Sequence, residues 1–171
     1  MKKVEMDIAE LIRRSQSKTG KFLTVGTAES ATGGKVADRL TDIRGSSDYF
    51  EGSIVSYSNE VKVGVLGVRK EIIENYGAVS SQTAIEMAHN GKRLLGVDIC
   101  VAVTGIAGPS GATLEKPVGL FYIGLSTESE NLSKKYFFHR DREGNKQDAS
   151  EAALNMLRQY LLKCISKLEN R

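Results

Sequence analysis

The sequence predicts an α/β fold, a three-layer α/β/α sandwich around a mostly parallel sheet with an antiparallel addition at one edge. Segments with helical periodicity alternate with short apolar runs, an order typical of helices packed on both faces of a parallel sheet. Residues 99–103 are apolar throughout and are followed by turn residues, which is typical of a central strand. Two strand-like runs near residues 118 and 133 follow each other with no helix between them, and this predicts the antiparallel edge. The length of 171 residues fits one domain, residues 1–171.

The individual elements follow from the spacing of apolar residues and from the residues that end each segment. Apolar residues recur at helical spacing over residues 4–18, and Gly20 is placed to end this first helix. After it we expect a strand at 22–27, a helix at 36–45, a strand at 49–57, helices at 59–66 and 80–95, and strands at 99–103, 118–125 and 133–139. The helix at 80–95 is expected to turn Ala84, Met87, Ala88, Leu94 and Leu95 inward. A long C-terminal helix closes the chain, with a core stripe of Ala149, Ala152, Ala153, Met156, Leu157, Tyr160, Leu161, Cys164 and Leu168.

The composition argues against several classes of protein. The 24 Lys and Arg residues against 21 Asp and Glu residues give a net charge of +3, and only 6% of residues are aromatic, so no nucleic-acid-binding surface is expected. No apolar run approaches the ~18 residues of a membrane span, and residues 4–7 begin no apolar stretch after Met1, so neither a membrane span nor a signal peptide is expected. Cys100 and Cys164 lie far apart without a Cys/His cluster, so no metal site is expected. Both thiols are expected to be buried as small apolar side chains of a cytoplasmic protein.

Two glycine-rich segments, each placed where a strand should meet a helix, are candidates for binding a ligand. They are residues 27–35 and 104–111. Free backbone N–H groups point outward at such junctions. The first segment is not a P-loop, because Ala31 stands where that pattern requires glycine and Val36 where it requires Ser or Thr. Its glycines still permit a backbone nest for an anion.

Several candidate residues also have ordinary structural explanations. Ser30 or Thr32 would serve as the cap of the following helix, and Lys62 as a solvated lysine on a helix face. His89 is expected on a helix surface and His139 at the end of a strand. Because no histidine lies near either glycine-rich segment, a serine nucleophile here would need another base, and lysine is the obvious candidate.

Six segments of the chain carry a specific pattern, namely residues 28–34, 45–47, 57–62, 77–80, 103–109 and 115–119. They resemble the C-terminal domain of the competence/damage-inducible CinA family, the nicotinamide-nucleotide amidase family. The resemblance runs from about residue 22 to the final helix. One such segment alone would be a weak match, but six in the family's order are highly specific.

The resemblance implies that the carboxamide of nicotinamide mononucleotide is hydrolysed to nicotinic acid mononucleotide and ammonia. The family's nucleophile corresponds to Ser30, its general-base lysine to Lys62, and an arginine of a late block to Arg142. The residues expected to bind substrate, with its phosphate at the glycine-rich turns or at Arg142, are Tyr57, Thr32, Gly33, Gly34, Thr104, Gly105, Ala107, Gly108 and Arg142. The chain departs from the family at Ala31, where cysteine is usual, at Arg140, where glycine is usual, and at Lys146, where arginine is usual.

Other functions stay open at this point. A non-catalytic nucleotide-binding or regulatory protein on the same scaffold is favoured by the altered block at Arg140 and Lys146 and opposed by Ser30 and Lys62. An amidase or pyrophosphatase that acts on another nucleotide is a third alternative. Tyr57 either contacts the pyridine ring or closes the core at the end of its strand. We expect no metal or organic cofactor. The expected partner is a small-molecule nucleotide, and the sequence does not decide whether the chain forms a homo-oligomer. Some members of the family carry an additional N-terminal domain with different chemistry, and the activity of that domain is not expected of these 171 residues.

Overall fold

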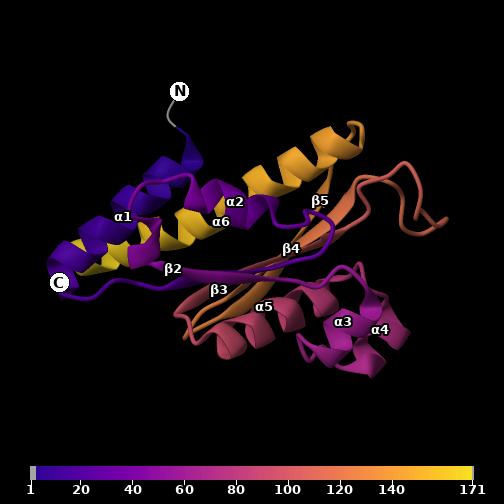
Figure 1. Cartoon of the computed structure of the whole chain (residues 1–171), viewed down its shortest axis with the longest axis horizontal. Helices are drawn as coiled ribbons and strands as arrows, with labels where there is room; N and C mark the ends of the chain where they lie inside the picture. Colours follow the sequence, from indigo (N-terminus) through magenta and orange to yellow (C-terminus); the bar gives the residue numbers. More distant parts are fainter. Residues whose placement is uncertain (1–2, 171) are drawn as a thin grey trace.

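Helices cover both faces of a mixed β-sheet in the computed structural model, which describes residues 3–170 (Figure 1). Within this range five strands form the sheet in the order β2-β1-β3-β4-β5. They are β1 (Val25–Glu29), β2 (Phe50–Val55), β3 (Ile99–Gly105), β4 (Leu120–Ser126) and β5 (Asn131–Phe137). β1 pairs in parallel with β2 and β3, whereas β4 pairs antiparallel with both β3 and β5. The α/β sandwich with an antiparallel edge is therefore confirmed.

The sheet is less parallel than the sequence predicts, because two of its four pairs within residues 3–170 are antiparallel. The physical reason lies in the connections after β3. Residues 106–119 return to the sheet as a loop without a crossover helix, and only a short turn at 127–130 joins β4 to β5. Parallel neighbours need a long crossover, so each of these connections reverses the strand direction.

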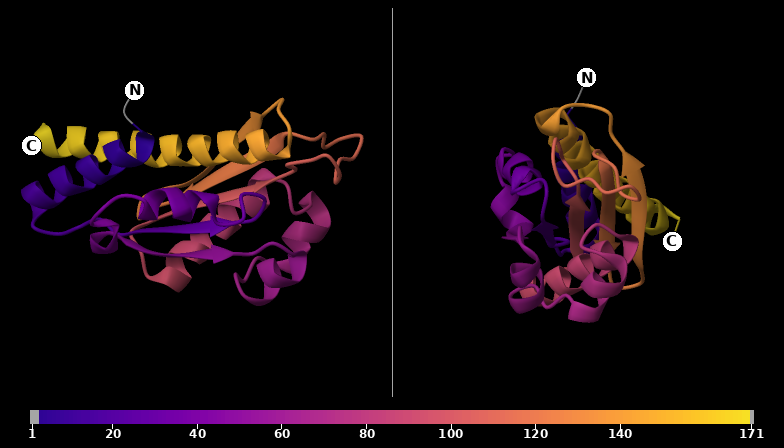
Figure 2. Two further views of the ribbon diagram at one scale, coloured as in Figure 1. Left: turned by 45° about the horizontal axis from the view of Figure 1, so that its top comes forward. Right: turned by 90° about the vertical axis from the view of Figure 1, so that its right-hand side faces the viewer.

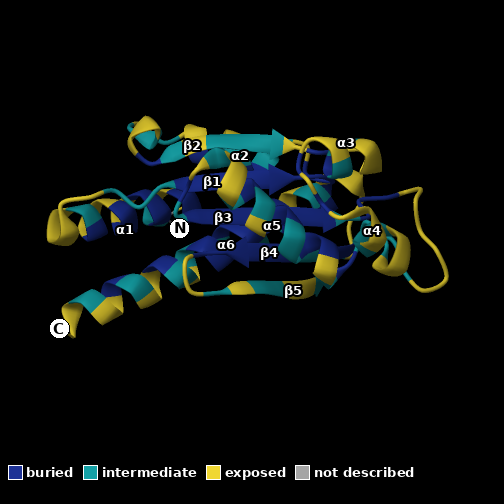
Figure 3. Cartoon of the chain, turned by 90° about the horizontal axis from the view of Figure 1, so that it is seen from below, coloured by how far each residue is buried: buried dark blue, intermediate teal, exposed yellow. Residues whose placement is uncertain are grey.

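The helices form two layers that bury the sheet between them (Figure 2). One layer holds α1 (Val4–Thr19), α2 (Lys35–Thr41) and α6 (Arg142–Glu169), and the other holds α3 (Asn59–Gly64), α4 (Lys70–Tyr76) and α5 (Ser81–Leu95). Along β3, Val101 and Val103 enter the core on the α6 side, whereas Cys100 and Ala102 enter the core on the α5 side. Burial on both faces explains why this strand is apolar throughout. The inner strands are mostly buried and the edge strands β2 and β5 are half-buried or exposed (Figure 3).

Several local predictions need correction. β1 begins at Val25, three residues later than predicted, because Thr24 is held just before the strand by Asp98, whose carboxylate accepts from the Thr24 N–H and hydroxyl at 2.8 and 3.0 Å. α2 ends at Thr41 and not near residue 45, and the sequence analysis missed α4. Leu94 is 47% exposed, since it lies on the outer side of α5. Cys164 is only half-buried, although Cys100 is buried as predicted.

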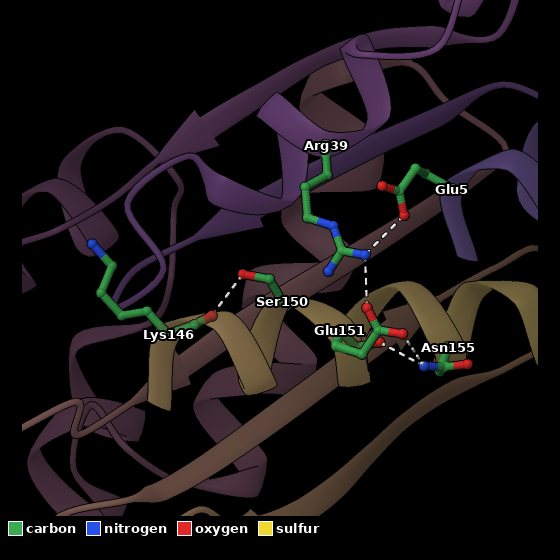
Figure 4. A network of polar contacts seen from close by, with 6 residues as sticks. All are labelled: Glu5, Arg39, Lys146, Ser150, Glu151 and Asn155. Carbon is green, nitrogen blue, oxygen red and sulfur yellow. Dashed lines mark hydrogen bonds and ion pairs between the residues drawn. The ribbon is translucent and has the colours of Figure 1, made fainter. Parts of the chain in front are cut away.

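A partly buried ion-pair network joins the three helices of the α6 layer (Figure 4). The Arg39 guanidinium of α2 donates to Glu5 of α1 at 2.8 Å and to Glu151 of α6 at 2.6 Å. The Glu5 and Arg39 side chains are only 3% and 13% exposed, so solvent screens this contact less than a surface pair. The network fixes α2 relative to α6, and both helices begin beside the site described next. Within residues 3–170, no helix combines the length and the apolar character that a membrane span requires.

Candidate active site

The candidate site lies at the carboxyl ends of the parallel strands β1, β2 and β3. Glu29, the last residue of β1, is paired with Val55 of β2 and Val103 of β3. Ser30 follows directly, and its backbone N–H donates to the Val103 carbonyl at 2.9 Å. Ligands of open α/β sheets commonly bind in the crevice outside these strand ends. The fold therefore places Ser30 where a reactive hydroxyl can meet a ligand.

The turn that carries Ser30 is held by the buried carboxylate of Glu29. This carboxylate accepts from the N–H groups of Gly34, Val36 and Ala37 at 3.0, 3.1 and 2.9 Å. It also accepts from the Thr32 hydroxyl at 2.7 Å. Glu29 thus satisfies the free N–H groups at the start of α2.

The explanation of Ser30 or Thr32 as the cap of the helix is consequently wrong. α2 begins at Lys35 after Gly34, and no side chain of the N-cap residue bonds to it. Gly33 and Gly34 have positive φ angles of 62° and 99°, which lets the chain turn sharply between Ser30 and the helix. The sequence analysis missed Glu29, although an acidic residue shortly before a predicted helix was a usable signal.

Replacing Glu29 by glutamine is expected to destabilise the protein. The amide group keeps the shape but places an NH2 group among backbone donors and removes the charge that several hydrogen bonds share. We expect the free energy of unfolding to fall by about 2 kcal/mol or more, measured by urea denaturation. Glu128→Gln, at an exposed position, is the matched control. Equal denaturation midpoints for the two variants would contradict this role of Glu29.

Lys62 reaches the site from α3, whose first turn is capped by Ser58 through a hydrogen bond from the Val61 N–H at 3.1 Å. The Lys62 side chain is buried, with only 2% of the residue exposed. Its Nζ donates to Ser30 Oγ at 2.9 Å and to the Ser56 carbonyl at 2.8 Å. The explanation of Lys62 as a solvated surface lysine is therefore wrong.

Burial lowers the pKa of Lys62 from 10.5 to about 8, and the attraction of Glu60 opposes this only in part. Loss of water disfavours the charged ammonium, because a compact cation is strongly hydrated. About a tenth of the Lys62 amine is then neutral at pH 7. Neutral Lys62 beside Ser30 can accept the serine proton, so the pair can generate a nucleophilic oxygen.

A cleft of about 240 Å³ opens over Ser30. Its lining includes Ser30 and five of the predicted substrate-binding residues, namely Tyr57, Gly105, Ala107, Gly108 and Arg142. The other lining residues are Ala31, Ile106, Ser110 and Gly111. Tyr57 is 61% exposed, so it does not close the core. The cleft thus joins the two glycine-rich segments at one place.

The start of α6 fastens the second glycine-rich segment to this cleft. Arg142 donates from Nη1 to the Gly108 carbonyl and from Nη2 to the Tyr57 hydroxyl, both at 2.8 Å. Buried Asn145 donates to the Ala107 carbonyl at 3.0 Å. Arg142 therefore links both walls of the cleft. The sequence analysis missed Asn145, because one asparagine in the first turn of a long helix gives no signal.

The remaining predicted residues lie outside the lining of the cleft. Thr32 donates to Glu29, and the Thr104 hydroxyl donates to the Ala78 carbonyl at 2.7 Å. Gly33 and Gly34 form the turn beside the cleft. Arg140 pairs with Asp148 at 2.9 Å, so this departure from the family pattern does not intrude on Ser30.

Backbone donors are available in the cleft for a developing negative charge. Within residues 3–170 the N–H groups of Ala31, Ala107 and Gly108 have no hydrogen-bond acceptor. All three residues line the cleft with Ser30. Donors that point toward a reacting carbonyl oxygen stabilise the oxyanion formed by attack of a hydroxyl, by ~3–4 kcal/mol for a single donor.

Other reactive side chains are remote or unreactive. Burial raises the pKa of the Cys100 thiol to about 12, which makes this thiol a poor nucleophile. His89 is exposed on α5, as predicted, and His139 is exposed two residues after the end of β5; neither lines the cleft. In the described part of the chain, no group of three or more His, Cys, Asp and Glu side chains is placed to hold a metal ion.

Comparison with known proteins gives the family. Residues 5–161 match the model of the CinA C-terminal domain. The chain belongs to the CinA C-terminal domain family. A CinA-like protein of Geotalea uraniireducens is 49% identical over 139 residues, which are 81% of this chain and 33% of that protein. A CinA-like protein of Chloroherpeton thalassium is 46% identical over 162 residues, which are 92% of this chain and 37% of that protein. The chain thus spans well under half the length of these curated relatives.

Solved CinA-type structures share this fold over most of the chain. The competence/damage-inducible protein CihA of Agrobacterium tumefaciens is 40% identical, with a TM-score of 0.80, over 88% of this chain and 93% of that one. A competence or damage-inducible protein of Enterobacter asburiae is 29% identical, with a TM-score of 0.85, over 94% of this chain and 99% of that one. The resemblance to the CinA family seen in the sequence is therefore confirmed.

Proposed function

We propose that this CinA-type chain is a nicotinamide-nucleotide amidase. It hydrolyses the carboxamide of nicotinamide mononucleotide, with Ser30 as the nucleophile and Lys62 as the general base. The observation that carries the proposal is the buried contact of 2.9 Å between Lys62 Nζ and Ser30 Oγ. The matched family domain, residues 5–161, acts as one catalytic unit, and its free thiols suit the reducing cytoplasm.

The first half of the reaction forms an acyl-enzyme. Neutral Lys62 accepts the proton of Ser30 while Oγ attacks the carboxamide carbon, and a C–O bond forms. The carbonyl oxygen becomes an oxyanion, which the free N–H groups lining the cleft stabilise. As the intermediate collapses, the C–N bond breaks and protonated Lys62 returns its proton to the departing nitrogen, which leaves as ammonia.

The second half regenerates the enzyme. A water molecule attacks the ester carbon and loses a proton to neutral Lys62. The bond to Ser30 Oγ breaks, and the proton passes from Lys62 to this oxygen, so nicotinic acid mononucleotide is released. Tyr57 is exposed at the mouth of the cleft, where its ring is available to contact the pyridinium of the substrate.

An ammonia-release assay tests the proposal. We expect nicotinamide mononucleotide to release ammonia, and its kcat/KM to exceed that of the riboside by at least about tenfold, because a site built for a charged group discriminates against a ligand that lacks it. Free nicotinamide should react more slowly still.

Two outcomes would select the other functions. Thermal stabilisation by the mononucleotide without ammonia release indicates a non-catalytic binding protein. If the chain releases ammonia from the amide of a different nucleotide but not from nicotinamide mononucleotide, it is an amidase of another specificity. Either result overturns the proposed activity.

A further inference from the structure

A second hollow, of about 460 Å³, adjoins the cleft over Ser30. It is lined by Lys35, Asp141, Arg142, Glu143 and Lys146. Arg142 lines both spaces, so they are neighbours on either side of this side chain. We call this space the basic hollow.

Two unpaired lysines distinguish the basic hollow. Lys35 is the first residue of α2 and Lys146 lies one turn into α6, and both are half-buried. Within residues 3–170 neither ammonium group forms an ion pair or a hydrogen bond. A Cβ atom added to Gly33 would lie 3.8 Å from Lys146 Nζ. The amine of Lys146 therefore lies close to the turn that follows Ser30. Figure 4 shows the Lys146 side chain extending away from the Arg39 network.

The acidic residues of the basic hollow leave these lysines unneutralised. The Asp141 carboxylate is engaged as the cap of α6, where it accepts from the Gly144 N–H at 2.8 Å. Glu143 forms no ion pair with either lysine. The Arg142 guanidinium bonds only to neutral oxygens, so its charge also remains. Half-buried cations without partners favour the binding of an anion that accepts hydrogen bonds from several donors.

We infer that Lys35 and Lys146 form a subsite for the phosphate monoester of the substrate. The inference rests on the proposed function, since a mononucleotide carries its phosphate and its carboxamide at opposite ends. The carboxamide lies at Ser30, and the ribose passes Arg142. The phosphate lies in the basic hollow, where the two lysines donate to its oxygens. The subsite therefore selects phosphorylated ligands.

Ribose 5-phosphate tests the subsite without any catalysis. We expect it to raise the melting temperature of the wild-type chain and to leave that of the double variant Lys35→Met/Lys146→Met unchanged. The matched control is Lys163→Met/Lys167→Met. It removes two exposed charges from α6, about 30 Å along the helix from Lys146. The control should respond as the wild type does. Lys146→Arg keeps the charge and should also respond.

Kinetics give a second measurement. In the double variant we expect the KM for nicotinamide mononucleotide to rise roughly tenfold or more, because charge-assisted hydrogen bonds to phosphate are lost. The KM for the riboside, which has no phosphate, should stay within about twofold. Should the double variant fail to fold, the single variants Lys35→Gln and Lys146→Gln decide by the same two measurements.

The outcomes separate the subsite from the proposed reaction. The absence of a melting shift in the wild type, or an undiminished shift in the double variant, overturns the subsite. A melting shift that depends on the lysines, in a chain that releases no ammonia from the mononucleotide, supports the subsite and overturns the proposed activity.

Discussion

Replacing Ser30 by alanine is expected to lower the rate of ammonia release from nicotinamide mononucleotide by about 10,000-fold or more. Removing a nucleophile deletes the covalent route as a whole, and what remains is catalysis by binding and backbone donors alone. Ser30 is 7% exposed at the floor of the cleft, and within residues 3–170 its Oγ is the one hydroxyl that Lys62 Nζ contacts. Single-turnover measurements of ammonia give the rate.

The same variant should still bind the substrate. Alanine removes one oxygen from the wall of the cleft and leaves Tyr57, Gly108 and Arg142 in place. The mononucleotide should therefore raise the melting temperature of Ser30→Ala about as much as that of the wild type. Ser129→Ala, in the exposed turn between β4 and β5, is the control and should keep full activity. A Ser30→Ala enzyme within about tenfold of the wild-type rate would show that Ser30 is not the nucleophile.

Residues 30 and 62 illustrate what the sequence could and could not predict. Helical periodicity placed Lys62 on a short helix, but nothing local indicated that the amine would turn inward. The contact arises because β1 and β2 are parallel neighbours, so the residues after them emerge at one edge of the sheet. From the sequence, only the resemblance to the CinA family indicated that Ser30 and Lys62 act together.

Glu29 and Asn145 show the opposite case, in which neither pattern nor resemblance gave a role. A glutamate at the end of an apolar strand resembles a solvent-exposed strand terminus. Its burial becomes favourable only when the start of α2 supplies three N–H donors. Asn145 likewise acquires its function from the loop carrying Ala107, which is distant in sequence. The role of Asn145 depends on a tertiary contact, which the spacing of residues along the chain does not encode, whereas the partners of Glu29 lie within eight residues of it and their pattern was missed.

The order of the strands in the sheet could not be predicted from the sequence either. Alternation of helices and strands indicated the layers correctly, and an apolar run identified β3 as a central strand. The loop at residues 106–119 decided the direction of β4, and glycine and proline content alone could not show that this loop reverses the chain. The sequence therefore predicted where the helices and strands lie better than it predicted how the strands pair.

Replacing Lys62 by methionine is expected to reduce ammonia release about as severely as Ser30→Ala, because the two residues act as one unit. Methionine fills the buried space but cannot accept a proton. Lys62→Arg should be no more active, since a guanidinium stays charged at all working pH values. Recovery of substantial activity in either variant would exclude Lys62 as the base.

The pH dependence measures the same group in the unmodified enzyme. With a pKa of about 8, about a tenth of Lys62 is neutral at pH 7, against roughly one part in three thousand for a lysine at 10.5. We therefore expect kcat/KM to rise about tenfold per pH unit below pH 8 and to level off above it. A kcat/KM that stays constant between about pH 6 and about pH 9 would contradict a lysine base.

The stability of the fold should report this pKa independently of catalysis. The unfolded chain holds the Lys62 proton up to an ordinary pKa of 10.5, whereas the folded chain releases it near 8. Between these values the unfolded state binds more protons, so the Lys62 contribution to the free energy of unfolding increases as the pH rises. Lys62→Met lacks this contribution, and its stability relative to the wild type should decline over the same interval. If the stability difference were constant with pH while the rate still rose near pH 8, the kinetic pKa would belong to a group other than Lys62.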